Sequence, residues 1–168
     1  MALPAYHSTW PGFAYTGVIE RLIRRFKYHG DLAAGRLLAD LLASRLVDTG
    51  APRPDLIVPV PLHFQRRLQR GFNQSALISR DLSGWFGGLP WLEALRRTRA
   101  TATQSALPAD RRGGNVRGAF AVRRLPPGTA HVALLDDVMT TGSTLSECAR
   151  VLRAAGVARV DVWVVARA

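Results

Sequence analysis

Residues Val132–Thr144 read VALLDDVMTTGST, an apolar run that leads into two carboxylates and then into a hydroxyl-rich turn with one glycine. The short and partly β-branched run His131–Leu135 predicts a buried strand, and the apolar spacing from Ser143 onward predicts a helix. A strand, a loop and a helix start therefore follow one another. With the other strands and helices expected below, this order predicts an α/β fold with a mainly parallel sheet and helices on both faces.

The loop between this strand and this helix suits a phosphate monoester. Backbone N–H groups at a helix N-terminus would point into the loop, Gly142 allows a tight turn, and the neighbouring hydroxyls add donors without adding charge. A helix cap after a buried strand is the structural alternative, although a cap needs only one side-chain oxygen. The residues predicted to bind phosphate are Val138, Met139, Thr140, Thr141, Gly142, Ser143 and Thr144.

Asp136 and Asp137 follow the predicted strand directly, and we expect both carboxylates to be exposed at its end. Carboxylates are poor neighbours for phosphate but good acceptors for vicinal hydroxyls, and they can lie near a divalent cation that phosphates carry. A phosphate site beside a diol site predicts a ribose 5-phosphate as ligand. Two solvated carboxylates without a ligand are the alternative.

Four apolar residues, an acidic pair and TTGST resemble the phosphoribosyl-pyrophosphate signature of the type I phosphoribosyltransferases. Three further stretches resemble the competence protein F (ComF/GntX) family in the same order: YTGVIERLIRRFKYHGD (15–31), LIVPVPLHFQRRLQRGFNQSA (56–76) and RTRATATQSALPADRRGGNVRGAF (97–120). The resemblance implies a type I phosphoribosyltransferase fold. It also implies a protein that binds 5-phosphoribosyl pyrophosphate with Mg²⁺ and transfers phosphoribosyl to an unidentified acceptor, in DNA uptake or nucleotide metabolism.

The same resemblance implies roles for individual residues. Asp136 and Asp137 would bind the ribose hydroxyls at the catalytic centre, and the ligand would hold magnesium near them without direct protein ligands. A loop after the strand 55–60 would bind pyrophosphate, and a flexible loop would close over it; an exposed basic turn and ordinary disorder are the alternatives. The pyrophosphate set is Pro61, Leu62, His63, Arg67 and Arg70, the flexible loop contains Arg97, Arg99, Gln104, Arg111, Arg112 and Asn115, and Lys27, Tyr28, Asn73 and Gln74 are further candidates.

The purine-salvage enzymes that share the signature carry an acidic base where Thr140 stands in this chain. This difference argues against the same kind of purine as the acceptor. The sequence does not identify another acceptor.

Several other elements are expected from apolar periodicity and from turn residues. Thr16 can cap the first helix through its side chain, and Asn73 looks like the cap of a later one. The expected helices are 16–28, 32–47 and 73–85, and the expected strands are 55–60, 91–95, 120–122 and 160–166.

A length of 168 residues with 48% hydrophobic content is enough for one domain with a sizeable core. No apolar run approaches the ~20 residues of a membrane span, and the first residues lack a signal-peptide pattern, so we expect a cytoplasmic protein without membrane insertion. The net charge of +11 favours anionic partners, but an arginine-rich composition that reflects genomic bias is an equal alternative. A homo-oligomer is compatible with these features.

Cys148 is the one cysteine of the sequence, which excludes a disulfide framework and a cysteine zinc site. Many ComF-like proteins carry a four-cysteine zinc ribbon before the segment that begins here near Tyr15. Either this member lacks the ribbon or the sequence begins late. We therefore assign 1–14 to an N-terminal extension without the ribbon and 15–168 to a phosphoribosyltransferase-like domain, and we expect no zinc.

A second hypothesis belongs to another functional class. The family resemblance implies a link to the DNA-uptake machinery, with single-stranded DNA and a competence helicase as candidate partners. On this view the chain handles single-stranded DNA without catalysis and uses the sugar-phosphate site for regulation. Aromatic side chains near basic residues, such as Tyr28 and Phe72, are compatible with base stacking but too common to establish it.

Overall fold

The computed structural model describes residues 3–62, 71–98 and 116–168, and it is built around a parallel sheet. The strand order is β1-β6-β5-β2, and all three neighbouring pairs are parallel. Trp91 adds an isolated parallel bridge to Ile57 on the outer side of β2. The strands are β1 (Ser8–Ala14), β2 (Leu56–Pro59), β5 (His131–Met139) and β6 (Arg159–Arg167).

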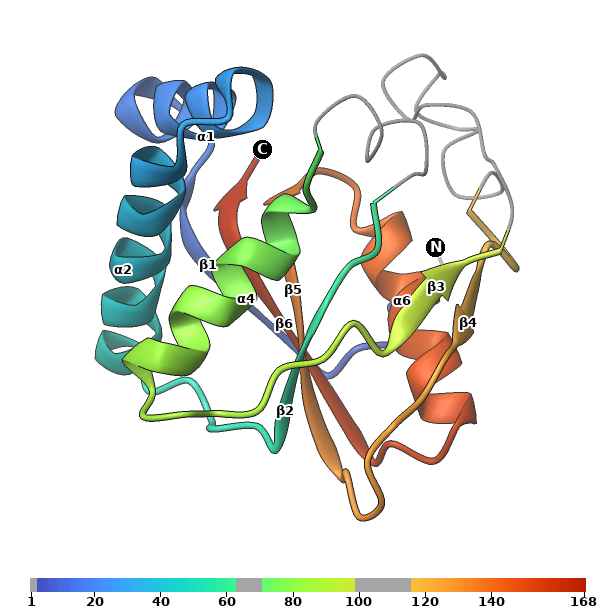
Figure 1. The fold of residues 1–168 in the computed structure, drawn as a ribbon. Helices are drawn as coiled ribbons and strands as arrows, with labels where there is room; N and C mark the ends of the chain where they lie inside the picture. Colours follow the sequence, from blue (N-terminus) through green and yellow to red (C-terminus); the bar gives the residue numbers. More distant parts are fainter. Residues whose placement is uncertain (1–2, 63–70, 99–115) are drawn as a thin grey trace.

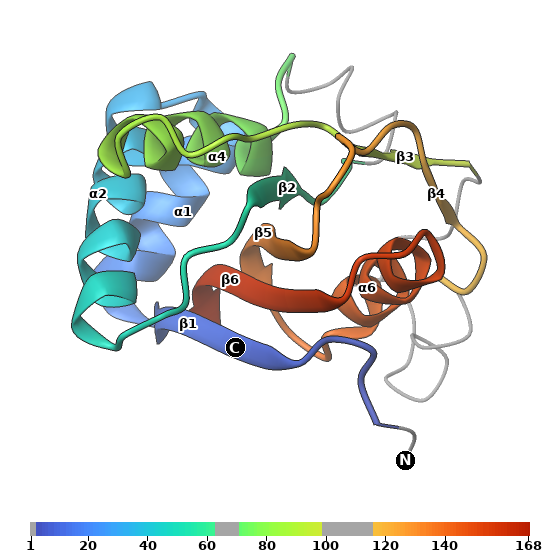
Figure 2. The ribbon, with the colours of Figure 1, turned by 90° about the horizontal axis from the view of Figure 1, so that it is seen from below.

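Helices cover both faces of this sheet, as Figures 1 and 2 show. Of the helices in the described residues, three pack on one face, while the fourth lies on the other face beside a short antiparallel pair, β3·β4. The first three are α1 (Gly17–His29), α2 (Leu32–Asp48) and α4 (Gln74–Trp85), and the other face carries α6 (Ser143–Ala154), β3 (Leu95–Arg97) and β4 (Phe120–Val122). The predicted α/β class with a parallel sheet is confirmed.

The apolar run of β5 explains why both faces are covered. Val132 and Leu134 pack into the core beneath α6, whereas Ala133 and Leu135 pack into the core beneath α1, α2 and α4. Successive side chains of a strand point to opposite faces, so a continuous apolar run has to be buried on both sides.

Two predicted strands differ from the observed ones. β5 does not end at Leu135 but pairs with β6 as far as Met139, so the acidic pair lies inside the strand. The strand expected at 91–95 is wrong, because Trp91 alone bridges to β2 and a regular strand begins at Leu95. The bond from Ala94 N to Leu92 O shows that the chain turns locally between these points.

The segment 1–14, assigned above to an extension, supplies strand β1 to the sheet. Ser8–Ala14 pairs with β6 from Asp161 to Arg167. Gly12 lies so close to that strand that an added Cβ would stand 2.9 Å from the Val165 carbonyl oxygen. The helix that follows begins after Thr16, whose side chain makes no capping hydrogen bond, so the expected side-chain cap is absent.

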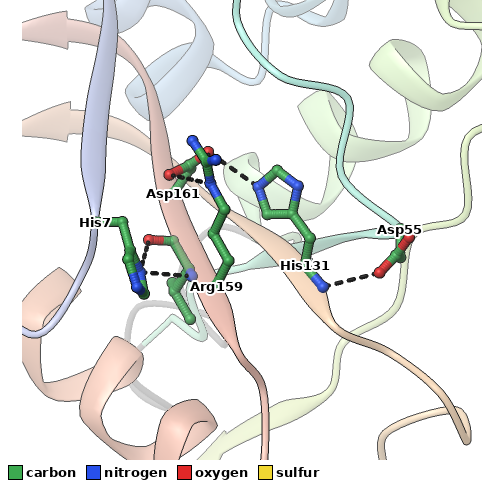
Figure 3. Close-up of polar contacts among 6 residues, drawn as sticks. His7, Asp55, His131, Arg159 and Asp161 are labelled. Carbon is green, nitrogen blue, oxygen red and sulfur yellow. Dashed lines mark hydrogen bonds and ion pairs between the residues drawn. The ribbon is translucent and has the colours of Figure 1, made fainter.

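A polar network lies at the amino ends of β5 and β6 (Figure 3). Asp161 is fully buried, and its Oδ2 lies 2.9 Å from His131 Nε2 and accepts a hydrogen bond from Arg159 Nε at 3.1 Å. Asp55 Oδ2 accepts the backbone N–H groups of Ala130 and His131 at 3.0 and 2.8 Å. The network joins the first residues of two central strands, so we assign it a structural role.

Asp161→Asn should lower the free energy of unfolding by about 2–3 kcal/mol, because it removes the charge that pairs with Arg159 inside the sheet. The loss should stay below that of a fully buried pair because Arg159 can turn toward water. Urea unfolding measures it. The affinity for 5-phosphoribosyl pyrophosphate should be unchanged, since the network lies at the amino ends of the strands and the residues predicted to bind this ligand lie near their carboxyl ends. An unchanged unfolding midpoint would contradict the structural role.

Candidate functional site

The carboxyl ends of the parallel strands gather the predicted site residues from several elements. β5 brings Asp136 and Asp137, the following turn brings the hydroxyl-rich loop, and α1 brings Lys27 from the far end of the chain. The amino end of α4 lies at the same edge, because Ser75 of this helix contacts Asp136. Ligands of open α/β sheets bind at this edge of the sheet.

Asp137 is almost fully enclosed, with 7% of its surface exposed, so the expectation that both carboxylates are exposed is wrong for this residue. Its Oδ2 pairs with Lys27 Nζ at 2.9 Å, and its Oδ1 accepts the Val138 N–H at 2.7 Å. The ion pair compensates the desolvation of a carboxylate that burial would otherwise disfavour.

Asp136 is half-buried, and its contacts differ from those of its neighbour. Its Oδ1 accepts hydrogen bonds from the Asp137 N–H at 2.9 Å and from Ser75 Oγ at 3.2 Å. Burial, followed by the negative charge of Asp137, raises the pKa of Asp136 to about 7, although Lys27 acts in the opposite direction. This carboxyl therefore changes its charge near neutral pH.

The hydroxyl-rich loop connects β5 to α6 as expected. Thr140 and Thr141 are exposed, and Gly142 precedes the helix in the left-handed conformation at φ 74°. Thr141 Oγ1 lies 2.9 Å from Ser143 Oγ and accepts the Ser143 N–H at 3.4 Å. Gly142 at the amino end of α6 has no side chain that could cap the helix, and the Thr141 hydroxyl reaches the first N–H group, that of Ser143, only at 3.4 Å.

Gly142 is the buried residue of this loop, and its surroundings explain why a glycine is required there. An added Cβ would stand 2.6 Å from Met139 Cε and 3.1 Å from the hydroxyl of Tyr6. Tyr6 belongs to the segment that precedes β1 and is not among the residues predicted for the site. No local pattern marks it, because it reaches the loop through the packing of that segment against α6, where Ser146 Oγ accepts the Ala5 N–H at 3.1 Å.

Val138 and Met139 were expected in the phosphate loop, but the structure places both inside β5. The Val138 N–H donates to Asp137, and its side chain packs against the core beneath α1, α2 and α4. Met139 is buried in the core beneath α6. The exposed part of the loop therefore starts at Thr140.

Asn73 and Gln74 mark the start of α4. Asn73 caps the helix, as predicted, through its Oδ1, which accepts the Ser75 N–H at 3.1 Å, and its Nδ2 donates to the Val60 carbonyl oxygen at 3.1 Å. Gln74 is buried, and among the described residues its Nε2 finds no hydrogen-bond acceptor. Pro61 and Leu62 follow β2 at the same edge and are half-buried.

The remaining residues predicted for the site do not gather at this edge of the sheet in the part of the chain that the structure describes. Tyr28 is 67% exposed at the end of α1. Arg97 lies in β3 and not in a loop, with its guanidinium 5.2 Å from the centre of the Phe120 ring. Eight predicted residues lie outside the described residues: His63, Arg67, Arg70, Arg99, Gln104, Arg111, Arg112 and Asn115.

Within residues 3–62, 71–98 and 116–168, no group of three or more His, Cys, Asp or Glu side chains could hold a metal ion. Cys148 is fully buried beneath the sheet, where burial raises the pKa of its thiol well above the usual range. Of the helices described, none combines the length and apolar character that crossing a bilayer requires.

Comparison with known proteins places this arrangement in a family. The chain is 46% identical to the DNA utilization protein YhgH of Escherichia coli strain K12 over 158 residues, which cover 91% of this chain and 69% of that protein. It is 39% identical to competence protein F of Haemophilus influenzae over 160 residues, which cover 92% and 70%. The chain belongs to the competence protein F family. The competence protein ComFC of Streptococcus pneumoniae is similar at 25% identity over 92% of this chain and 66% of that protein.

No protein-family model matches the chain. Among solved structures, that of the allosteric regulatory enzyme of purine biosynthesis is similar with a TM-score of 0.50 and 20% identity, over 79% of this chain and 26% of that one. At this identity the similarity shows the fold alone. This member of the competence protein F family therefore has the type I phosphoribosyltransferase fold.

Proposed function

We propose that this competence protein F family member binds 5-phosphoribosyl pyrophosphate with magnesium and transfers its phosphoribosyl group to an acceptor. One observation carries the proposal: β5 brings a half-buried carboxylate and a hydroxyl-rich helix start to the same end of a phosphoribosyltransferase fold. Phosphate binds well at helix N-termini, and carboxylates accept hydrogen bonds from diols. The two parts match the two ends of a ribose 5-phosphate.

The chemistry would proceed at the anomeric carbon of the ribose. The loop Thr140–Thr144 would hold the 5-phosphate and Asp136 the ring hydroxyls, which fixes the sugar while an acceptor approaches. The acceptor forms a bond to the anomeric carbon as the bond to pyrophosphate breaks, and the pyrophosphate leaves with the bonding electrons. Fixed positions and charges stabilise the oxocarbenium-like transition state. We also propose that the stretch 61–70 binds the pyrophosphate. Of this stretch, the structure describes Pro61 and Leu62.

The donors at this edge of the sheet suit a magnesium ion that is held mainly by the bound ligand. Mg²⁺ usually takes one or two carboxylates, several waters and the phosphate oxygens of its ligand. The edge offers the half-buried Asp136, whereas Lys27 already pairs with Asp137. The ligand would hold the ion near these carboxylates, where its charge would offset that of the departing pyrophosphate.

Calorimetric titration with 5-phosphoribosyl pyrophosphate in the presence of magnesium tests the binding. We expect saturable one-site heat, weaker binding of ribose 5-phosphate, and still weaker binding of inorganic pyrophosphate. A screen of candidate acceptors for pyrophosphate release then tests transfer. Absence of binding in the first titration would refute the proposed function.

A second candidate function rests on the names of the relatives, which include DNA utilization proteins at 46% identity. In this version the chain handles single-stranded DNA in a cytoplasmic uptake complex that includes a helicase, and the sugar-phosphate site is regulatory. Competition decides between a shared and a separate DNA site. In a competition at constant ionic strength, with pyrophosphate as control, DNA held by the basic surface alone should stay bound when 5-phosphoribosyl pyrophosphate is added. In a separate salt titration, the affinity for this DNA should fall log-linearly with the salt concentration.

A further inference from the structure

The four oxygens of the acidic pair are not equivalent. Both oxygens of Asp137 are engaged by the chain itself, Oδ1 by the Val138 N–H at 2.7 Å and Oδ2 by Lys27 Nζ at 2.9 Å. Asp136 Oδ1 is engaged by the Asp137 N–H and by Ser75 Oγ. From the described part of the chain, no donor contacts Asp136 Oδ2, which leaves it as the acceptor for a ligand.

Burial supports the same division. Asp137 has 7% of its surface exposed and has a cation beside it, so a ligand hydroxyl would have to displace Lys27 to reach it. Asp136 is more exposed than Asp137, and Lys27, which forms its ion pair with Asp137, acts on Asp136 less strongly than burial and the charge of Asp137 do.

Ser75 is held firmly enough to orient Asp136. It is the second residue of α4, its N–H donates to the Asn73 cap, and Asn73 in turn donates to the Val60 carbonyl oxygen at the end of β2. The side chain is 4% exposed, so its hydroxyl has little access to water. A short side chain on a tethered helix start loses little conformational freedom when it makes this hydrogen bond.

We propose that Ser75 is a positioning residue that turns the Asp136 carboxylate so that Oδ2 faces the ribose diol, while Asp137 and Lys27 form a buried brace that does not contact the ligand. This inference rests on the proposed function and deepens it. The family resemblance implied that Asp136 and Asp137 both bind the ribose hydroxyls. In this proposal Asp136 alone binds them, and Asp137 belongs to a structural ion pair.

The Ser75 part is tested by titrating magnesium and 5-phosphoribosyl pyrophosphate into variants of the full chain. Ser75→Ala should bind roughly fivefold more weakly because the carboxylate loses its orienting hydrogen bond. Ser75→Thr retains the hydroxyl and should restore the affinity to within about twofold of the wild-type value. Ser79→Ala is the matched control, since Ser79 is also buried on α4 but donates to the Ser75 carbonyl oxygen at 2.8 Å and not to Asp136.

The division between the carboxylates is tested in the same titration. Asp136→Asn should lose at least tenfold in affinity, whereas the neutral pair Lys27→Gln with Asp137→Asn should stay within about threefold, because amides can hydrogen-bond to each other in place of the ions. Melting curves confirm that each variant is folded. The double variant avoids the uncompensated lysine that Asp137→Asn alone would leave.

The outcomes separate the inference from the proposed function. Equal losses in Asp136→Asn and in the double variant would overturn the brace, and unchanged affinity in Ser75→Ala would overturn the positioning role. Both results would leave the proposed function intact, because the wild-type protein still binds. Absence of binding by the wild-type protein would refute the proposed function and the inference together.

Discussion

Asp136→Asn should weaken binding of 5-phosphoribosyl pyrophosphate with magnesium by at least tenfold and, at pH 8, make the free protein more stable. The affinity falls because an amide replaces a charged acceptor, and hydrogen bonds to charged groups are worth about 1.5–3 kcal/mol. The stability rises because ionising a half-buried carboxylate beside Asp137 is costly. Calorimetric titration measures the first effect, and urea unfolding measures the second.

The sign of the stability effect follows from proton linkage. The pKa of Asp136 is raised from 3.8 to about 7 in the folded protein, mainly by burial and then by Asp137. A carboxyl with a raised pKa stabilises the fold in its protonated form, so the wild-type protein loses this stability as the pH rises from about 4 through 7. Asn remains neutral throughout. The variant should therefore gain about 1–3 kcal/mol at pH 8, and the gain should shrink as the pH falls toward 4.

Asp40→Asn provides a control for the change in net charge, because Asp40 is an exposed carboxylate on α2, far along the chain from the acidic pair. It should leave affinity and its pH dependence unchanged. A decrease in the stability of Asp136→Asn at pH 8, or an affinity equal to that of the wild-type protein, would contradict the role assigned to this carboxyl.

Gly142→Ala should reduce the affinity for the same ligand by at least tenfold and the stability by about 2 kcal/mol. The residue has φ 74°, a conformation that costs other residues roughly 1–2 kcal/mol. Its Cβ would also stand 2.6 Å from Met139 Cε and 3.1 Å from the Tyr6 hydroxyl. The Met139 terminus can move, but it is enclosed in the core, so we expect the loop to shift and its N–H groups to lose their alignment.

Gly128→Ala separates the loop displacement from backbone strain. Gly128 has nearly the same conformation, φ 77°, but an added Cβ would meet nothing within 4 Å. It lies in the turn before β5, at the opposite end of the strand from the loop. This variant should lose about 1 kcal/mol of stability and keep its affinity. Similar affinities for the two variants would show that the 5-phosphate does not bind at the Gly142 loop.

Local patterns were sufficient for much of the fold. The apolar run before the acidic pair is buried on both faces of β5, as a parallel strand requires, and Asn73 caps α4 through its side chain as its residue type predicts. Helices and strands whose periodicity was clear appear within a few residues of their expected bounds. These features depend on the conformational preferences of neighbouring residues, and neighbouring residues are what a sequence pattern contains.

The failures arise where one element depends on another. β5 continues to Met139 because β6 supplies hydrogen-bonding partners there, and the strand expected at 91–95 is reduced to one bridge because the chain turns after Trp91. Val138 and Met139 consequently become strand residues with packed side chains. Pairing between distant segments decided these points, and it leaves no periodic signal in either segment.

By itself, the sequence determined that a strand, an acidic pair, a hydroxyl-rich turn and a helix follow one another, because each depends on the chemistry of adjacent residues. The tertiary structure decided how the two carboxylates differ. Lys27 from α1 encloses Asp137, and Ser75 from α4 contacts Asp136. Identical side chains in adjacent positions acquire different contacts through burial and through partners from distant helices, and these depend on how the helices pack against the sheet.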